Sequence, residues 1–274
     1  MYRIVKKKEI APLTYMILVD APLIAKRARC GQFVILRIDE RGERIPLTIA
    51  ERYPNGGLIK IIFQEVGLTT RRLRCIPEGG EVVDLIGPLG NPTKVENYGT
   101  VVLVGGGYGA ASLEIISREM RAAGNTIISI VGARSSNFLV QVEEIGANSD
   151  ELHISTDDGT RGEKGFVVAP LERIIKSRHV DLIIAIGPVP MMKAVANVTR
   201  SYGIKTIVSL NPIMVDGTGM CGSCRVSIGG KTMFACVDGP DFDARTVDFD
   251  LLINRQKMYL EEEGIAARRQ CTCS

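Results

Sequence analysis

The stretch TVVLVGGGYG, residues 100–109, decides the class of fold of this chain. A continuous apolar run that ends in glycines is typical of a buried parallel strand turning into a helix, and residues 110–123 continue with the spacing of an amphipathic helix. Such a corner can bind a pyrophosphate, because glycines let the backbone approach it and the helix N-terminus offers N–H donors. The spacing is not G-x-G-x-x-G, so a corner without a ligand stays the alternative. The candidate residues are Gly105, Gly106, Gly107 and Gly109.

The same pattern repeats after this corner. We expect four further buried strands with helices between them, the strands at residues 126–131, 152–156, 181–186 and 206–210, and the helices at 167–176 and 190–202. Strand–helix alternation predicts a doubly wound parallel sheet, which we assign to residues 98–210. Ligands of such sheets bind at the carboxyl ends of the strands. Asp157 and Asp158 follow one strand, where a turn is the most economical interpretation and a metal site is poorly supported.

Residues 1–97 have a different pattern. Short β-rich runs alternate with turns and charges, at residues 14–19, 32–38, 58–64 and 81–86. The sequences PNGG (54–57) and PEGG (77–80) are clear turn signals. Regular short strands without long helical periods predict an antiparallel barrel or sandwich.

Two segments of this first half are candidate binding segments. In RIPLTI (44–49), Arg44 can fork onto a phosphate, and the hydroxyl of Thr48, two residues beyond the rigid Pro46, can reach a ring heteroatom. A turn with a surface arginine is the alternative for these residues taken alone. The stretch from Gly67 to Thr70, followed by two arginines, offers a second anion contact or a helix N-terminus capped by a threonine.

Residues 211–248 are rich in loops and hold a D-x4-C-x2-C-x11-C array. Plant-type 2Fe–2S sites use C-x4-C-x2-C and a distant fourth Cys, so the spacing is kept while a carboxylate replaces the first sulfur. Glycines in the loop can wrap the backbone around a small inorganic core. A rubredoxin-like iron site or a structural zinc site is the alternative, but it would call for two C-x2-C pairs, and only one is present. The candidate ligands are Asp216, Cys221, Cys224 and Cys236.

Residues 249–274 are expected to form a terminal helix over 251–267 and a tail. The tail carries Cys271 and Cys273, for which a frayed end with reducible thiols is preferred over metal binding or a subunit contact. The net charge of +3 gives no argument for nucleic acid. No apolar run is long enough to span a bilayer and the first ten residues lack the apolar core of a signal peptide, so no membrane partner and a cytoplasmic location are expected.

Taken together, these segments resemble the ferredoxin-reductase-like electron-transfer subunits of the sulfide dehydrogenase and dihydroorotate dehydrogenase type. The resemblance covers nearly the whole chain in unbroken order. The family segment R-x-P-L-S/T-I matches Arg44, Pro46, Leu47, Thr48 and Ile49, and V-G-x-G-T matches Val66, Gly67 and Thr70 with Thr69 where Gly is usual. The motifs G-P-L-G-N and T-D-D-G-S/T-x-G-x-K-G are kept at 87–91 and 156–165. Two more are altered, with Ser112 in place of Pro at the end of 105–112, and Ile186 in place of Cys before Gly187, Pro188, Pro190, Met191 and Met192.

The resemblance implies a fold and a set of cofactors. The implied fold is an antiparallel β-barrel flavin domain, a doubly wound α/β nucleotide-binding domain and a small 2Fe–2S module. FAD would contact Arg44, Pro46, Leu47, Thr48, Gly67 and Thr70. NAD(H) would contact Gly105, Gly106, Gly107, Gly109, Asp157, Asp158, Gly187 and Pro188, and Arg134 leaves NADP(H) open. The 2Fe–2S cluster would be bound by Asp216, Cys221, Cys224 and Cys236. No side chain has to act as a general base, so no catalytic residue is assigned.

The resemblance also implies a role within a complex. The chain would pass electrons between NAD(P)H, FAD and the cluster as the smaller partner of a larger flavin- and iron–sulfur-containing subunit, and it would reach ferredoxin through that complex. Pyrimidine-pathway relatives generally carry four cysteines at the cluster, so Asp216 favours the electron-bifurcating ferredoxin:NADP oxidoreductase branch. The alternatives are the electron-transfer subunit of dihydroorotate dehydrogenase and a non-catalytic iron–sulfur sensor.

Overall fold

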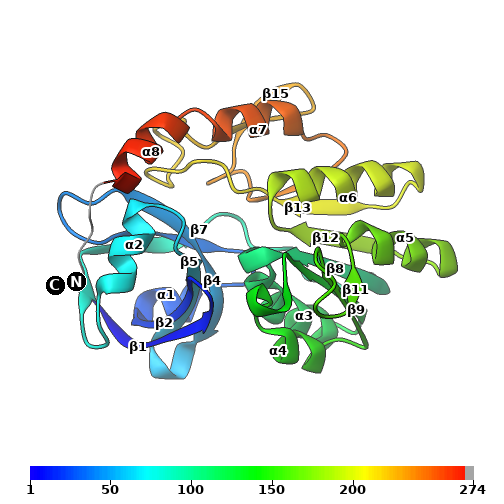
Figure 1. The fold of residues 1–274 in the computed structure, drawn as a ribbon, viewed down its shortest axis with the longest axis horizontal. Helices are drawn as coiled ribbons and strands as arrows, with labels where there is room; N and C mark the ends of the chain where they lie inside the picture. Colours follow the sequence, from blue (N-terminus) through cyan, green and yellow to red (C-terminus); the bar gives the residue numbers. More distant parts are fainter. Residues whose placement is uncertain (269–274) are drawn as a thin grey trace.

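The computed structural model describes residues 1–268, and its N-terminal part is an antiparallel barrel (Figure 1). Seven strands are hydrogen-bonded in the order β6-β1-β2-β5-β4-β3-β7. Their bounds are β1 (Tyr2–Ala11), β2 (Thr14–Asp20), β3 (Phe33–Arg37), β4 (Arg44–Tyr53), β5 (Leu58–Gln64), β6 (Glu81–Val82) and β7 (Asp84–Leu89). Apolar residues of β2, β3 and β5 alternate inward, and Val19, Val34 and Ile61 are fully buried in one core cluster.

The barrel is nearly closed because its two edge strands are neighbours in sequence. β6 pairs with β1 and β7 pairs with β3, at opposite edges of the sheet, yet only Val83 separates them. The Val83 N–H lies 3.2 Å from the carbonyl oxygens of both Arg37 and Ile38. The single strand expected over residues 81–86 is therefore wrong, since the chain changes from one edge to the other at this residue. Three short helical segments accompany the strands, α1 (Pro22–Arg27), η1 (Pro54–Gly56) and α2 (Leu68–Cys75).

The second part is a mostly parallel sheet with the order β11-β10-β9-β8-β12-β13-β16. Its strands are β8 (Thr100–Gly106), β9 (Thr126–Ala133), β10 (Glu151–Thr156), β11 (Glu163–Lys164), β12 (Leu182–Ile186), β13 (Thr206–Ser209) and β16 (Asp241–Asp243). All neighbours are parallel except β16, which runs antiparallel to β13. From β8 the chain continues through β9 and β10 on one side of the sheet. It then returns to the other side of β8 and continues through β12 and β13. The switch point, where doubly wound sheets bind ligands, lies between β8 and β12.

Helices cover both faces of this sheet, as the sequence predicted. Val101 and Leu103 pack with residues of α3 (Leu113–Ala122) and α4 (Val142–Ala147). Val102 and Val104 pack on the other face with residues of α5 (Val168–Ser177) and α6 (Val189–Ser201). The first helix begins later than expected, because residues Gly107–Ser112 form a 3-10 segment, η2, ahead of α3. A further 3-10 turn, η3, spans Ser136–Phe138.

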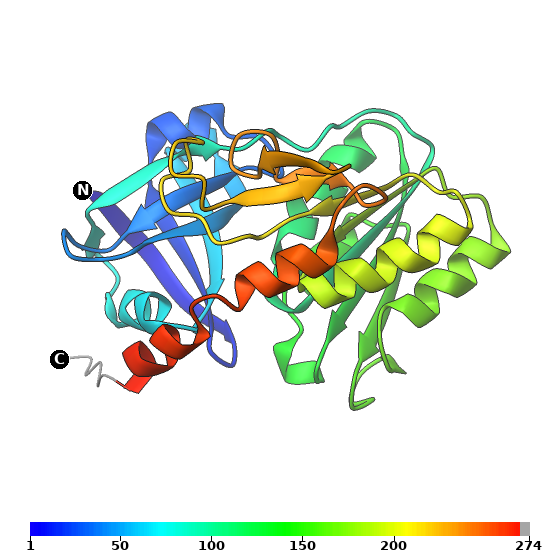
Figure 2. The same ribbon diagram turned by 90° about the horizontal axis from the view of Figure 1, so that it is seen from above.

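Residues 211–248 are built onto both other parts. Strand β16 extends the parallel sheet, and the hairpin of β14 (Arg225–Ile228) and β15 (Lys231–Phe234) lies over the junction with the barrel (Figure 2). The loop that carries the candidate ligands docks on the barrel at Gly217. A Cβ there would lie 2.6 Å from Leu89 Cδ1 and 2.8 Å from Ile35 Cγ1, and the φ of +76° is itself a glycine conformation. This glycine is thus required by packing against β3 and β7.

The C-terminal segment contains two helices instead of the one expected. α7 (Phe249–Gln256) packs beside α6, and Lys257–Tyr259 form a turn before α8 (Leu260–Arg268). α8 returns to the barrel near α2, so the chain closes over the other parts (Figures 1 and 2). The expectations for Cys271 and Cys273 fall outside the described residues.

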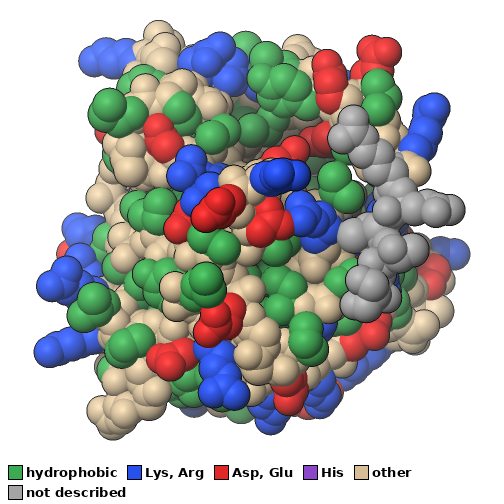
Figure 3. Space-filling model, turned by 90° about the vertical axis from the view of Figure 1, so that its left-hand side faces the viewer, with side chains coloured by type: hydrophobic (Ala, Val, Ile, Leu, Met, Phe, Trp, Pro, Cys, Tyr) green, Lys and Arg blue, Asp and Glu red, His purple; other side chains and the backbone are tan. Residues whose placement is uncertain are grey.

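The barrel end of the molecule presents charges of both signs. Figure 3 shows Lys and Arg side chains interspersed with Asp and Glu over this face, without a patch of one sign. The ion pairs Arg72–Asp39 and Arg37–Asp84 belong to the barrel. Within residues 1–268, none of the helices has the length and apolar character that crossing a membrane requires.

Candidate cofactor sites

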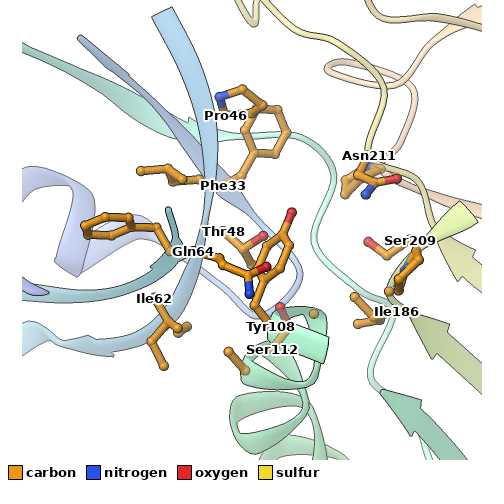
Figure 4. A pocket seen from close by; sticks show the side chains of 18 of the residues that line it. Phe33, Pro46, Thr48, Ile62, Gln64, Tyr108, Ser112, Ile186, Ser209 and Asn211 are labelled. Atoms are coloured by element: carbon orange, nitrogen blue, oxygen red, sulfur yellow. The ribbon is translucent and has the colours of Figure 1, made fainter. Parts of the chain in front are cut away.

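A cavity of about 450 Å³ lies where the three parts of the molecule meet (Figure 4). One wall is the barrel, through β3, β4, β5 and the start of α2. A second wall is the carboxyl edge of the parallel sheet at β8, β12 and β13, the edge where such sheets bind ligands. The third wall comes from residues 211–248, through Asn211, Met214 and Pro240. A single cavity therefore contacts all three parts.

The barrel wall contains most of the residues predicted to contact FAD. Pro46, Leu47 and Thr48 line the cavity in the middle of β4, and Thr70 lines it from α2. Arg44 is the first residue of β4, so a strand replaces the turn considered for it; it does not line the cavity. Its side chain is exposed and makes no ion pair within the described part of the chain. A free guanidinium at this position can reach a phosphate outside the cavity.

Gly67 and Thr70 form the helix start that was the alternative for this segment. Gly67 precedes the first residue of α2, and Thr70 Oγ1 accepts the N–H groups of Val66 at 3.0 Å and of Gly67 at 3.1 Å. The threonine thus satisfies two backbone donors at the start of the helix. It does so while lining the cavity, whereas Gly67 itself stands outside the lining.

The glycines at the sheet edge lie in different surroundings, so a side chain would be excluded or accommodated for a different reason at each of them. A Cβ at Gly105 would lie 2.6 Å from Leu113 Cδ1, so this glycine lets the strand pack against its own helix. A Cβ at Gly106 would lie 2.4 Å from Met191 Sδ, which belongs to the second corner. Gly107 differs from both, because its φ is +55° and nothing lies within 4 Å of its Cβ position. Among the glycines predicted for this corner, Gly107 is the one whose surroundings leave room for a ligand.

Asp157 and Asp158 lie on the same edge of the sheet but away from the cavity. They follow β10, which is separated from β8 by β9. Asp158 Oδ1 accepts the N–H of Thr160 at 3.0 Å and its hydroxyl at 2.7 Å, and these bonds lower the pKa of Asp158. This is the turn that the sequence favoured. Gly187 and Pro188, in contrast, follow β12 and line the cavity.

Sequence reasoning missed the residue that stands in the middle of the cavity. Tyr108 occupies the variable position of the glycine corner, and its ring points into the space between the barrel wall and the residues at the ends of β12 and β13 (Figure 4). Enclosure raises the pKa of the Tyr108 phenol, and a hydrogen bond to Asn211 partly offsets this rise. The motif gave the place of the tyrosine, but the direction of its side chain follows only from the three-dimensional arrangement.

The four candidate ligands of the cluster loop lie in two pairs. Cys224 Sγ and Cys236 Sγ are 3.1 Å apart and buried. Asp216 Oδ2 accepts the N–H of Cys221 at 2.8 Å, while Asp216 Oδ1 accepts that of Thr218 at 2.7 Å. Within residues 1–268, no group of three such side chains surrounds one point as the ligands of a single ion do. The contact between Asp216 and Cys221 is made through the backbone N–H of Cys221, whereas Cys224 and Cys236 bring two ligand atoms together directly.

The thiols differ in how readily they ionise. Burial, followed by the neighbouring Cys224, raises the pKa of Cys236 to about 12. The exposed Cys221 is hydrogen-bonded to Ser223 Oγ at 3.4 Å, and this lowers its pKa. A metal deprotonates a coordinating thiol outright, so the buried pair is suited to a bound cluster and inert without one.

The cluster loop is tied to the cavity by a short stretch of backbone. Asn91 N–H donates to Gly239 O at 2.7 Å, and Asn91 Nδ2 donates to Val237 O at 3.0 Å. Cys236 precedes this stretch and Pro240, which lines the cavity, follows it directly. The backbone that bears one cluster ligand thus continues into the wall of the cavity and is held there by the end of the Gly-Pro-Leu-Gly-Asn motif.

A nearly closed antiparallel barrel, a doubly wound sheet and a cysteine-bearing loop around one cavity define the class of modular ferredoxin-reductase-like electron-transfer proteins, with the fold that the sequence predicted. The chain belongs to the family of dihydroorotate dehydrogenase B electron transfer subunits, which confirms the predicted family. Residues 211–248 match the family described as the iron–sulfur cluster binding domain of dihydroorotate dehydrogenase B.

Similarity to individual proteins extends over almost the full chain. It is 46% identical over 266 residues to the dihydroorotate dehydrogenase B (NAD(+)) electron transfer subunit homolog of Thermotoga maritima, covering 97% of this chain and 94% of that protein. It is 32% identical over 249 residues to the corresponding subunit of Bacillus velezensis, covering 87% and 94%. A chain in the structure of an NADH-dependent reduced ferredoxin–NADP oxidoreductase, solved to study flavin-based electron bifurcation, is 45% identical with a TM-score of 0.93, covering 98% of this chain and 97% of that one.

Proposed function

We propose that this chain is the small electron-transfer subunit of an electron-bifurcating ferredoxin:NADP oxidoreductase. It passes electrons between NAD(H), an FAD in the three-walled cavity and a 2Fe–2S cluster in residues 211–248. The observation that carries the proposal is the cavity itself. Its walls come from the barrel, from the ligand-binding edge of the sheet and from the iron–sulfur domain, so one bound group can face both electron donor and electron acceptor.

FAD supplies the conversion between the two-electron chemistry of nicotinamide and the one-electron chemistry of the cluster. The residues of the chain position and shield it. Thr48 presents a hydroxyl to the ring on the barrel side, and Arg44 is placed at the start of β4 to bind a phosphate. Apolar side chains, among them Phe33 and Ile62, give the cavity a largely apolar lining. The open backbone at Gly107 leaves room for the dinucleotide at the sheet edge.

We assign the cluster to Asp216 and Cys221 as one pair of ligands and to Cys224 and Cys236 as the other. The contacts that support this assignment are the bond between Asp216 Oδ2 and the Cys221 N–H and the 3.1 Å distance between the two buried sulfurs. Iron accepts a carboxylate oxygen, although soft sulfur ligands are the usual choice. We likewise propose that the residues predicted from the sequence to contact FAD and NAD(H) bind those cofactors.

The partner is proposed to be a larger subunit that carries flavin and iron–sulfur groups, through which electrons reach ferredoxin. The 45% identity to the NADH-dependent reduced ferredoxin–NADP oxidoreductase chain supports this branch over a dihydroorotate-oxidising complex, whose B. velezensis subunit is 32% identical. The T. maritima protein, at 46% identity, is named only as a homolog of that subunit. A non-catalytic iron–sulfur sensor would need no cavity shared by all three parts.

The test is anaerobic purification of the native complex followed by a count of cofactors. We expect one FAD and two irons in this subunit, and bleaching of both the flavin and cluster absorption when NADH is added. A chain that binds iron but no flavin would favour the sensor. Oxidation of dihydroorotate by the purified complex would favour the pyrimidine pathway.

A further inference from the structure

We propose that Tyr108 is a gate between the flavin side and the nicotinamide side of the cavity. In the absence of dinucleotide its ring covers the flavin on the side of the sheet, and a nicotinamide ring displaces it when NAD(H) binds. The proposal rests on the proposed function, and it concerns a residue that none of the motifs assigns to a cofactor.

The position of the ring carries the argument. Tyr108 belongs to η2 at the sheet edge, and its side chain extends from that edge to the middle of the cavity (Figure 4). Thr48 and Gln64 come from the barrel wall in front of it, while Ser209 and Asn211 come from the opposite side. A flavin on the barrel wall and a nicotinamide at the sheet edge must meet across this space. Hydride transfer needs reacting atoms about 3–3.5 Å apart, which leaves no room for a third ring between them.

The local backbone fixes the base of the side chain and leaves its ring free. On one side of Tyr108, Gly109 is packed against the second corner, since a Cβ there would lie 2.9 Å from Gly187 Cα. Tyr108 as a whole residue is 44% exposed, so neighbouring atoms cover only part of its side chain, although its phenol end is enclosed enough to raise its pKa. Rotation about the side-chain bonds, without a change in the corner, is enough to move it. Asn211 is the group that can hold the hydroxyl while the gate is closed.

The Tyr108 ring can stack on the flavin ring, as the nicotinamide ring that replaces it does. Aromatic pairs gain roughly 0.5–1.5 kcal/mol beyond the area they bury, which corresponds to about two- to tenfold in an equilibrium constant. Dinucleotide binding must overcome this contact. The gate therefore lowers the apparent affinity for NAD(H) and shields the flavin from solvent while the site is empty.

The experiment compares the FAD-loaded parent with Tyr108→Ala, Tyr108→Phe and the control Tyr202→Ala. Tyr202 follows α6 and is 43% exposed, close to the value for Tyr108, but it lies at the opposite edge of the sheet. Flavin fluorescence without dinucleotide reports the stacked ring, and titration with NAD+ gives the dissociation constant. We expect Tyr108→Ala to raise the fluorescence and to tighten NAD+ binding roughly two- to tenfold. Tyr108→Phe should keep the parent fluorescence and tighten NAD+ binding less than Tyr108→Ala, because it loses only the contact with Asn211.

Two results would overturn the gate. Unchanged fluorescence and NAD+ affinity in Tyr108→Ala would show that the ring contacts neither cofactor. Weaker NAD+ binding would show that the ring holds the dinucleotide instead of excluding it. In both cases full FAD content and reduction by NADH would leave the proposed function intact. A parent protein that binds no FAD would count against the proposed function itself.

Discussion

Gly109 and Gly187 hold the two corners of the cofactor site in backbone contact. A Cβ at Gly109 would lie 2.9 Å from Gly187 Cα and 3.1 Å from Ile186 O. The two corners follow β8 and β12, which are adjacent strands at the switch point of the sheet. Their turns emerge side by side, and only residues without a side chain fit between them. The glycine pattern thus shapes the site before any cofactor binds.

We expect Gly109→Ala to destabilise the protein by about 1–3 kcal/mol, the usual cost of overpacking. FAD content should fall as well, because the corner borders the cavity. The measurement is thermal unfolding followed by a flavin assay of the purified protein. Gly264→Ala is the matched control, since nothing lies within 4 Å of that Cβ position in α8. Equal stability of the two variants would show that the corners can separate without cost.

Gly107 allows a sharper test of the dinucleotide site. We expect Gly107→Leu to raise the KM for NADH steeply with FAD content unchanged, because a side chain would occupy the open approach to the corner. The control is Gly203→Leu, which has a similar left-handed φ (+68° against +55°) and equally open surroundings. Gly203 follows α6 at the opposite edge of the sheet, so both variants carry about the same backbone strain of 1–2 kcal/mol. A KM that rises equally in both would place the nicotinamide elsewhere.

The sequence predicted what depends on local pattern. Short β-rich runs between turns predicted the antiparallel barrel, and the alternation of strands and helices that begins at residues 100–109 predicted the doubly wound parallel sheet. Prediction from the sequence failed where tertiary contacts decide the bounds of a strand or helix. Residues 81–86 look like one strand, but closure of the barrel divides them at Val83, and a tight turn at Lys257–Tyr259 divides the expected terminal helix.

In the candidate site, too, local patterns were predictable from the sequence and tertiary contacts were not. The cysteine spacing predicted which residues lie together in the cluster loop. It could not show that Gly217 serves contact with the barrel, because Ile35 and Leu89 are far away in sequence. Nor could it show that Tyr108 enters the cavity, since the neighbours that define that space come from all three parts of the chain.

The next prediction concerns the role of Arg44 in FAD binding. Arg44→Ala should weaken FAD retention roughly ten- to a hundredfold, because a charge-assisted bond to a phosphate contributes about 1.5–3 kcal/mol. The measurement is the FAD dissociation constant of the apoprotein by fluorescence titration. Arg41→Ala is the control, an exposed arginine in the loop just before β4. If Arg44→Ala and the parent bind FAD equally well, the phosphate lies elsewhere.

Asp241 predicts a pH dependence of stability. Its Oδ2 accepts the hydroxyl of Thr93 at 2.6 Å, while the buried Oδ1 has no partner in the described structure, and burial raises the pKa of this carboxyl. The folded state therefore holds the proton more tightly than the unfolded state. Stability is lost as the pH rises above the ordinary carboxyl range towards the raised pKa.

We expect Asp241→Asn to gain stability relative to the parent as the pH increases from about 5 to about 8, as measured by unfolding midpoints. Asp243→Asn, on the same strand, is the control, and its stability difference from the parent should stay constant from about pH 5 to about pH 8 and change only at lower pH. The hydrogen bond from Arg245 lowers the pKa of Asp243, so its carboxylate stabilises the fold above the ordinary carboxyl range. A difference between Asp241→Asn and the parent that stays constant with pH would contradict the argument.

The last prediction separates two roles of Asp216. Its carboxylate accepts two backbone N–H groups of the cluster loop, so it can brace the loop without touching iron. Asp216→Ala removes both roles. Asp216→Cys removes the bracing oxygens but restores a ligand at the first position of the plant-type spacing. If Asp216 binds iron, Asp216→Ala should lose iron and visible absorption, whereas Asp216→Cys should keep its iron with a shifted spectrum.

Asp238→Ala is the control for bracing alone, because Asp238 Oδ2 accepts the N–H of Phe234 at 2.7 Å in the same part of the chain. It should retain iron. The double variant Cys271→Ser, Cys273→Ser should also keep the parent spectrum, since the assignment leaves no ligand position for the tail. Loss of iron in Asp216→Cys to the same extent as in Asp216→Ala would identify Asp216 as a bracing residue. Loss of the cluster in the double variant would identify a tail thiol as the fourth ligand.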